Sequence, residues 1–223
     1  MEPLPPITIR MLWAALASLV ISQLTPPAVA NALALWPLHL AGPASFVDAV
    51  GAFRPWQLLT HMLLNGVLDL LFVALTLFYF AAQLERWWGR RRFLGFLAWC
   101  GLGAAVLQLL VSSVALALGW TQETASAGAD GLMYAILFAV AYLDPRREVR
   151  LLLPPIEMKM RTMVIVFTVI ALVFGIQARG VWGVAGFVGA MGIAWLHIRY
   201  WRGQPPFSKK KPPPKPRHLR SVN

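Results

Sequence analysis

The sequence predicts an all-α membrane protein built as a bundle of six transmembrane helices, with both chain termini in the cytoplasm. Three observations carry this prediction. Of the 223 residues, 58% are hydrophobic and only 13% are charged, a balance typical of membrane proteins. Six apolar stretches are long enough, or nearly long enough, to cross a bilayer. Lysine and arginine gather in the loops on one side of these stretches.

The apolar stretches follow one another along residues 1–203, which we expect to form one transmembrane domain. A helix needs about 20 apolar residues to cross the hydrocarbon core. The expected helices lie near residues 7–24, 56–83, 93–118, 131–143, 163–177 and 181–201. The fourth is short. Because a helix that begins at Asp130 rises only about 20 Å, we expect it to start below the outer surface, inside a cavity.

The basic residues set the expected orientation. One set of loops, together with the two terminal segments, holds every Lys and Arg except Arg54 and Arg179. Since cytoplasmic loops carry an excess of Lys and Arg, both termini are expected in the cytoplasm. The chain is then an integral multi-pass protein, of the plasma (inner) membrane if its source is bacterial. This topology explains the net charge of +11, and no nucleic-acid partner is expected.

Two segments outside the helices have their own expected roles. Residues 204–223 are basic and proline-rich, so we expect a disordered cytoplasmic tail that attracts anionic lipid headgroups. The alternative is that a partner domain binds the proline run. Residues 25–53 are expected to lie in or on the outer leaflet as a partly helical element. The lone Cys100 allows no disulfide within the chain, and neither a metal nor a cofactor is expected.

Polar residues inside apolar spans are expensive, so each one is a candidate site. In the second span, His61, Asn65 and Asp69 stand at i, i+4 and i+8, which stacks them along one face of a continuous helix. They are expected to point into the bundle together. The alternative is that they only bond to neighbouring helices and hold the packing.

Four motifs in order resemble those of the rhomboid intramembrane serine proteases, over roughly residues 53–201. "FRPWQLLTHMLLNG" is similar to the start of the family's second core helix, and "LERWWGRRRF" to its Glu-xxx-Gly turn. "GADGLMYA" resembles the Gly-x-Ser-Gly-xx-Tyr motif, and "VAGFVGAMGI" resembles the Ala-His-xx-Gly-xxx-Gly motif. The resemblance implies a rhomboid-like bundle in which a Ser-His dyad cleaves peptide bonds and second-helix side chains hold the oxyanion.

The chemical positions of that family are changed here. The nucleophile position falls on Asp130, which bears no hydroxyl, and the base position falls on Gly186, which has no side chain. The oxyanion positions fall on Asp69 and Val73, of which one would repel a developing oxyanion and the other donates nothing. The resemblance therefore implies a bundle that has lost its dyad.

The scaffold positions of the family are kept. They are Trp56, Glu85, Gly89, Gly128, Gly131, Tyr134 and Gly189. By resemblance, Tyr134 would face Gly186. The residues expected to form a polar cavity are His61, Asn65, Asp69, Asp130 and Tyr134. The glycines at 183, 186, 189 and 192 give the last helix a slim surface for close packing.

The remaining serine and histidine residues offer no dyad at the expected positions. Ser126 with His61 is the one pairing near the outer mouth of the cavity. His197 lies eleven residues past Gly186, about 16 Å further along the helix, which is too far. His39 is expected at the surface.

The leading hypothesis is thus a non-catalytic rhomboid-like protein in the lipid bilayer that binds transmembrane segments of client proteins without cleaving them. One alternative is an intramembrane protease, either of rhomboid type or with Asp69 and Asp130 as a carboxylate pair. A second alternative is transport or proton relay along His61, Asn65, Asp69 and Asp130. A metal site made of Asp69, His61 and Asp130 is a further alternative.

Overall fold

The computed structural model describes residues 4–38, 53–122, 124–150, 157–180 and 184–201. The predicted tail and His39 lie outside these residues. The described chain is almost entirely helical. Its elements are α1 (Pro6–Leu24), α2 (Pro27–Leu33), α3 (Gln57–Thr60), the 3₁₀ turn η2 (His61–Leu63), α4 (Val67–Thr76), the π-helical turn η3 (Leu77–Ala81), α5 (Ala82–Ala117), α6 (Asp130–Leu143), strands β1 (Glu148–Arg150) and β2 (Glu157–Lys159), α7 (Met160–Arg179) and α8 (Ala185–Trp201).

Three helical segments are long and apolar enough to cross a membrane: Pro6–Leu24, Asp69–Ala117 and Met160–Gln177. α6 is apolar but shorter, with 14 residues, and it begins at Asp130 as expected. α8 covers the described part of the sixth predicted stretch with 17 residues. The described part of the chain is therefore helical apart from one short hairpin, with three candidate membrane spans by length and composition.

The second predicted helix is wrong as one continuous element. The chain leaves the helix after Leu63 and begins α4 only at Val67, with non-helical backbone at Leu64 (ψ 89°) and extended backbone at Gly66 (ψ 166°). The physical cause is Asn65, whose amide Nδ2 donates to the carbonyl of Met62 at 2.7 Å. This local bond competes with the helical ladder, and the glycine that follows lowers the cost of leaving it.

The predicted turn at Gly89 is found as a kink inside α5. Gly89 has φ 73° and ψ 165°, a left-handed conformation that glycine adopts without the steric cost of a Cβ. Helical residues precede and follow it, so the chain changes direction there without a loop. The long arm from Gly89 to Ala117 supplies the central helix of the fold.

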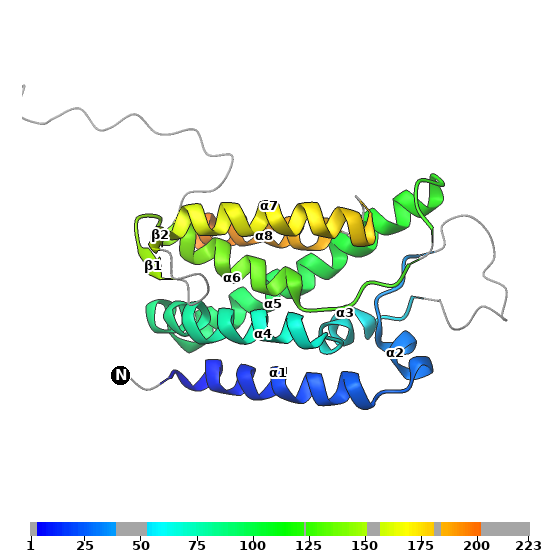
Figure 1. Cartoon of the computed structure of the whole chain (residues 1–223), viewed down its shortest axis with the longest axis horizontal. Coiled ribbons are helices and arrows are strands. Elements are labelled where there is room, and N and C mark those ends of the chain that lie inside the picture. The colour runs from blue at the N-terminus through cyan, green and yellow to red at the C-terminus, as the bar shows by residue number, and fades with distance from the viewer. Residues whose placement is uncertain (1–3, 39–52, 123, 151–156, 181–183, 202–223) are drawn as a thin grey trace, which may run out of the picture.

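The helices are arranged in layers (Figure 1). α1 and α4 lie on one side, α7 and α8 on the other, and α5 and α6 run between them. The core is built where α8 packs on α5 and α6, around side chains such as Phe93, Phe96 and Ile136, all less than 2% exposed. The outward faces of α1 and α7 are apolar and exposed, as helices facing lipid require: Trp13, Leu16, Val20, Val169, Val173 and Phe174.

Small residues allow the close packing of α5 against α8. A Cβ built on Gly189 would lie 2.5 Å from Leu107 Cδ1, and one built on Gly103 would lie 2.3 Å from Ile193 Cδ1. Each glycine therefore receives a large side chain of the facing helix. The predicted slim surface of the last helix is found at Gly186 and Gly189, while Gly192 has open space around it.

Glu85 joins the start of α1 to the kinked segment. Its Oε1 accepts a hydrogen bond from Ile7 N (3.0 Å), and its Oε2 accepts from Thr8 N and Thr8 Oγ1 (both 2.8 Å). Glu85 is 4% exposed, and Thr8 is fully buried. The first amides of a helix have no partner within it, and a carboxylate at this end also favours the helix dipole. Glu85 thus caps α1 from 77 residues away.

The same end of the bundle holds the last turn of α8 and the antiparallel hairpin β1–β2. Trp88, beside the kink, packs against Trp201 with ring centroids 5.8 Å apart. The hairpin, which the sequence did not predict, lies at the end where α1 begins (Figure 1). The start of α1, the hairpin and the end of α8 therefore lie at the same end of the bundle.

Candidate functional site

The loop that leads into α6 is held in place from two sides. Ser126 exchanges backbone hydrogen bonds with Leu35 in both directions, each 2.8 Å long. Gly128 has φ 113° and donates its N–H to the carbonyl of His61 at 2.9 Å. The positive φ explains why glycine stands at 128. This loop fixes Asp130 as the first residue of α6.

A small cavity of about 40 Å³, here called the α6 cavity, lies at this helix start. Its walls come from the α6 loop, η2, α5 and α8. Among its lining residues are His61, Gln108, Ser126, Asp130, Gly186 and Phe187. The two positions expected to carry a nucleophile and a base, Asp130 and Gly186, are thus brought to one cavity although 56 positions separate them in the chain.

Gln108 of α5 fills the space above Gly186. Its Oε1 accepts a hydrogen bond from Gly186 N at 2.6 Å. A Cβ built on Gly186 would lie 3.1 Å from this oxygen and 3.3 Å from Gln108 Cβ. Gly186 is in the first turn of α8, where amides lack a partner within the helix. Gln108 therefore caps α8 and stands where a longer side chain at 186 would need to emerge.

His61 and Ser126 line the α6 cavity but do not form a pair. His61 is 7% exposed, and its Nδ1 lies 2.8 Å from the carbonyl oxygen of Gln57. Because a carbonyl only accepts, Nδ1 carries the proton and Nε2 of the neutral ring is the acceptor. Between these two residues, both within the described chain, no hydrogen bond is formed. The Ser126–His61 pairing is not assembled.

Asp69 lies apart from this cavity, so the row of His61, Asn65 and Asp69 on one helix face is wrong. Asp69 is exposed, and its Oδ2 accepts a hydrogen bond from Gly66 N at 3.3 Å. It caps the start of α4 and is absent from the linings of both cavities described here. The break at Leu64–Gly66 is the cause, because it changes the direction of the chain between Asn65 and Asp69.

Asn65 connects three parts of the chain at that break. Its Nδ2 donates to Ser18 Oγ of α1 at 3.2 Å, and its Oδ1 accepts from Ala129 N at 3.1 Å. Ser22 Oγ of α1 donates to the carbonyl of Asn65 at 2.9 Å. Asn65 is 5% exposed, so these bonds are shielded from competing solvent. It ties α1 and the start of α6 to the broken second span.

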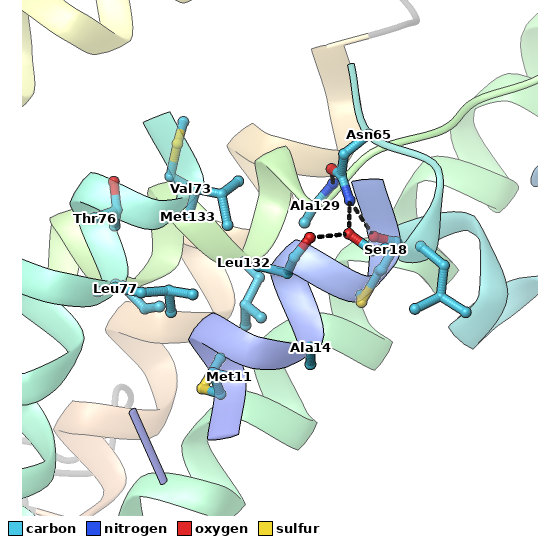
Figure 2. Close-up of a pocket in the computed structure, with 14 residues that line it drawn as sticks. Met11, Ala14, Ser18, Asn65, Val73, Thr76, Leu77, Ala129, Leu132 and Met133 are labelled. Atoms are coloured by element: carbon cyan, nitrogen blue, oxygen red, sulfur yellow. Dashed lines mark hydrogen bonds between the residues drawn. The ribbon is translucent and has the colours of Figure 1, made fainter. Parts of the chain in front are cut away.

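Val73 lies against an apolar cavity, and Tyr134 lies near Asp130 and packs on α8. Val73 lines a larger cavity of about 140 Å³ between α1, α4 and α6, called the α1 cavity (Figure 2). Gly186 is not among the residues that line it. Tyr134 packs on Phe187, the neighbour of Gly186, with ring centroids 5.0 Å apart at 37°. The expected contact of Tyr134 is thus found one residue further along α8.

The other retained motif residues have structural positions. Trp56 is half exposed and donates its indole N–H to the carbonyl of Ala32 at 3.2 Å, and Arg54 lies over its ring at 5.3 Å. His197 packs between Phe96 and Trp201 with centroids at 5.8 Å and 4.2 Å, near the far end of α8 from the α6 cavity. It belongs to an aromatic cluster and not to the site.

Within the parts of the chain that the structure describes, no group of three or more His, Cys, Asp or Glu side chains could hold a metal ion. The metal site considered for Asp69, His61 and Asp130 is therefore not formed. The carboxylate pair of Asp69 and Asp130 is not formed either, since Asp69 is exposed at the cap of α4.

Gln108 is the site residue that sequence reasoning missed. It is the one glutamine in the apolar run "GLGAAVLQLLVSSVALAL", and a polar side chain inside such a span marks a partner. The rule that singled out Asn65 could have found it. Its partner is a backbone N–H on another helix, which no side-chain pattern reveals.

A family described as eukaryotic integral membrane protein (DUF1751) matches residues 9–211. The chain belongs to this family. As a member of it, the protein is an integral membrane protein and sits in a lipid bilayer. The family description gives no support to a bacterial plasma membrane. No curated protein matches the chain.

The contact between Gly186 and Gln108 predicts how variants at these two positions change the stability of the protein. Gly186→Ala should lower the free energy of unfolding by about 1 kcal/mol, because the new methyl group presses on Gln108. Gln108→Ala should cost about 1 kcal/mol through the lost acceptor. Unfolding in mixed micelles should show the double variant to be at least about 0.5 kcal/mol more stable than the sum of single effects predicts. Additive losses would contradict the contact.

Proposed function

We propose that the protein is a rhomboid-like membrane protein that binds transmembrane segments of client proteins without cleaving them. The observation that carries the proposal is the state of the α6 cavity. Asp130 and Gly186 line it at the two positions where the resemblance puts a nucleophile and a base, and the amide of Gln108 takes up the space above Gly186. A serine attack needs a proton acceptor at this place, and glycine offers none.

Client binding is supported by what surrounds the cavity. α4 and α7 both pack on α6 and expose apolar side chains to the bilayer, among them Leu71, Phe72, Val169 and Phe174. Asp130, the first residue of α6, lines the α6 cavity together with Ser126 and Gly128 of the loop. A client helix that carries a polar residue could pack on an apolar face and present that residue to Asp130.

The orientation belongs to the same proposal. We place both termini, and the end of the bundle that holds the kink at Gly89, in the cytoplasm. Its support is the clustering of Arg86, Arg90, Arg91 and Arg92 around that kink. The basic tail would then meet the anionic lipids of the cytoplasmic leaflet.

The enzymatic and transport alternatives have less support. A two-aspartate protease needs its carboxylates within reach of one proton, and Asp69 instead caps α4 at the surface. A proton relay through the second span needs a connected polar row, and the break at Leu64–Gly66 interrupts the row. A rhomboid-type serine mechanism would have to use Ser126, so Ser126 is the residue to test.

The proposal predicts that the protein cleaves no peptide bond. Purified protein should not react with a serine-directed fluorophosphonate probe, and single-pass reporter helices reconstituted with it should stay intact on a gel. Labelling that disappears in Ser126→Ala would contradict the proposal. Cleavage lost in Asp130→Asn but kept in Ser126→Ala would instead favour a carboxylate mechanism.

Client binding is measured in reconstituted vesicles by energy transfer between the labelled protein and a labelled reporter helix. A reporter with one central asparagine should associate more strongly than an all-leucine reporter of equal length. Asp130→Ala should reduce this preference, and Asp69→Ala is the matched control because its carboxylate lies elsewhere. Equal association of both reporters with every variant would overturn client binding at this site.

A further inference from the structure

The α1 cavity has no part in the proposed function, and its lining indicates a ligand of a different kind. It measures about 140 Å³ and is walled by α1, η2, α4, η3 and α6 (Figure 2). Most of the wall is apolar, including Met11, Met62, Val73, Leu77, Met133 and Ile136. Apolar cavities of about this size, near 150 Å³, stay dry and bind small apolar molecules.

Ser18 and Asn65, at one end of the cavity, already form hydrogen bonds within the protein. Ser18 Oγ donates to Ala15 O at 2.7 Å and accepts from Asn65 Nδ2. The amide of Asn65 is also bonded to Met62 O and Ala129 N. A water inside the cavity needs two to four polar partners. Ser18 and Asn65 already bond each other, and Thr76 is the one further polar side chain in the lining. Water is therefore a poor occupant, and an empty space of this size is destabilising.

The position of the cavity decides the class of ligand. Ala14 and Ala15 lie halfway along α1, which at 19 residues is about as long as the hydrocarbon core is thick. The cavity reaches the surface at Ala14 and Leu63, which are both exposed. Its exposed edge thus begins at the middle of α1, at the depth of lipid tails.

We propose that the α1 cavity binds one acyl chain of a bilayer lipid, which enters past Ala14 and Leu63. The three methionines support this occupant, because their unbranched side chains adapt to a flexible chain of varying position. The volume admits a segment of one hydrocarbon chain and excludes a helix, whose diameter is about 10 Å. α1 then holds the chain against α4, fixed at its ends by Glu85 and Asn65.

The test uses phosphatidylcholine with a photoreactive diazirine near the middle of one acyl chain, diluted into nanodiscs that hold the full-length protein. Lipid around the protein will label exposed faces in any case. The diagnostic sites are Val73 and Ile136, which are 9% and 1% exposed and form the floor of the cavity. After irradiation, mass spectrometry should find label on these buried residues.

Matched variants on α1 separate the cavity from the surface. Ala15→Leu fills the cavity and should reduce floor labelling at least about fivefold, whereas Ala17→Leu, exposed and outside the lining, should leave it unchanged. If Ala15→Leu does not fold, Leu132→Ala replaces it and should increase floor labelling, because it enlarges the cavity.

Three outcomes would overturn the proposal. They are absence of floor labelling in the unaltered protein, equal floor labelling in Ala15→Leu and Ala17→Leu, and floor labelling that a co-reconstituted reporter helix abolishes. The last would mean that a client side chain is the natural occupant. Reporter association at α6 is measured separately, so failure here leaves the proposed function standing.

Discussion

Replacing Glu85 with alanine should release the start of α1 and lower the free energy of unfolding by about 3 kcal/mol. The variant removes a buried carboxylate that accepts three hydrogen bonds, and it leaves the N–H groups of Ile7 and Thr8 without their partner. Hydrogen bonds to charged groups are worth about 1.5–3 kcal/mol each, but part of this is recovered when water reaches the freed amides. Unfolding in mixed micelles measures the loss.

Hydrogen exchange distinguishes this effect from a general loss of stability. The amides of Ile7 and Thr8 should exchange faster in Glu85→Ala, while amides in the core of α6 keep their protection. Glu85→Gln retains one acceptor oxygen and should show a smaller loss. Glu148→Ala, an exposed residue of β1, is the control of equal chemistry and should change neither measurement. Unchanged exchange at Ile7 in Glu85→Ala would show that the cap is dispensable.

Replacing Gly131 with alanine should cost about 2 kcal/mol, a loss typical of overpacked cores. The new Cβ would lie 2.9 Å from the Cβ of Ala104 and 3.5 Å from the carbonyl oxygen of Gly186. Neither atom can rotate away, so α6 must separate from α5 and α8. Thermal unfolding of the purified variant measures this loss of stability. The α6 cavity should also change shape, because Gly131 is one of its lining residues.

Two comparisons test this explanation. Gly192→Ala, at a helical position with open space, should be neutral or stabilising by up to about 1 kcal/mol. Ala104→Gly should restore part of the stability lost in Gly131→Ala, because it removes the atom that collides. A Gly131→Ala protein as stable as the original would mean that the helices are not in close contact at this point.

The sequence predicted those features that depend on local composition. α1 and α6 lie at their predicted places because apolar length and the Gly-Ala-Asp-Gly start are visible in the chain, and Gly89 is found at a kink because only glycine takes its φ readily. The integral membrane character is confirmed by the family to which the chain belongs.

Two of the failures share a cause, which is bonding between distant parts of the chain. The helical face of His61, Asn65 and Asp69 failed because Asn65 bonds to α1 and to the α6 loop, and its side chain interrupts the helix. Gln108 was missed because its partner is a backbone amide on α8. The hairpin was missed because its strands are only three residues long and charged, too short for a periodic pattern.

The capping of α1 by a distant residue has a consequence for biogenesis. Ribosomes deliver the chain from its N-terminus, so α1 enters the membrane before its partners Asn65 and Glu85 have been made. The N–H groups of Ile7 and Thr8 lack their acceptor until Glu85 is synthesised, 78 and 77 residues later. The docking of α1 must therefore follow the synthesis of Glu85, and α1 stays uncapped in the membrane until the start of α5 has been made.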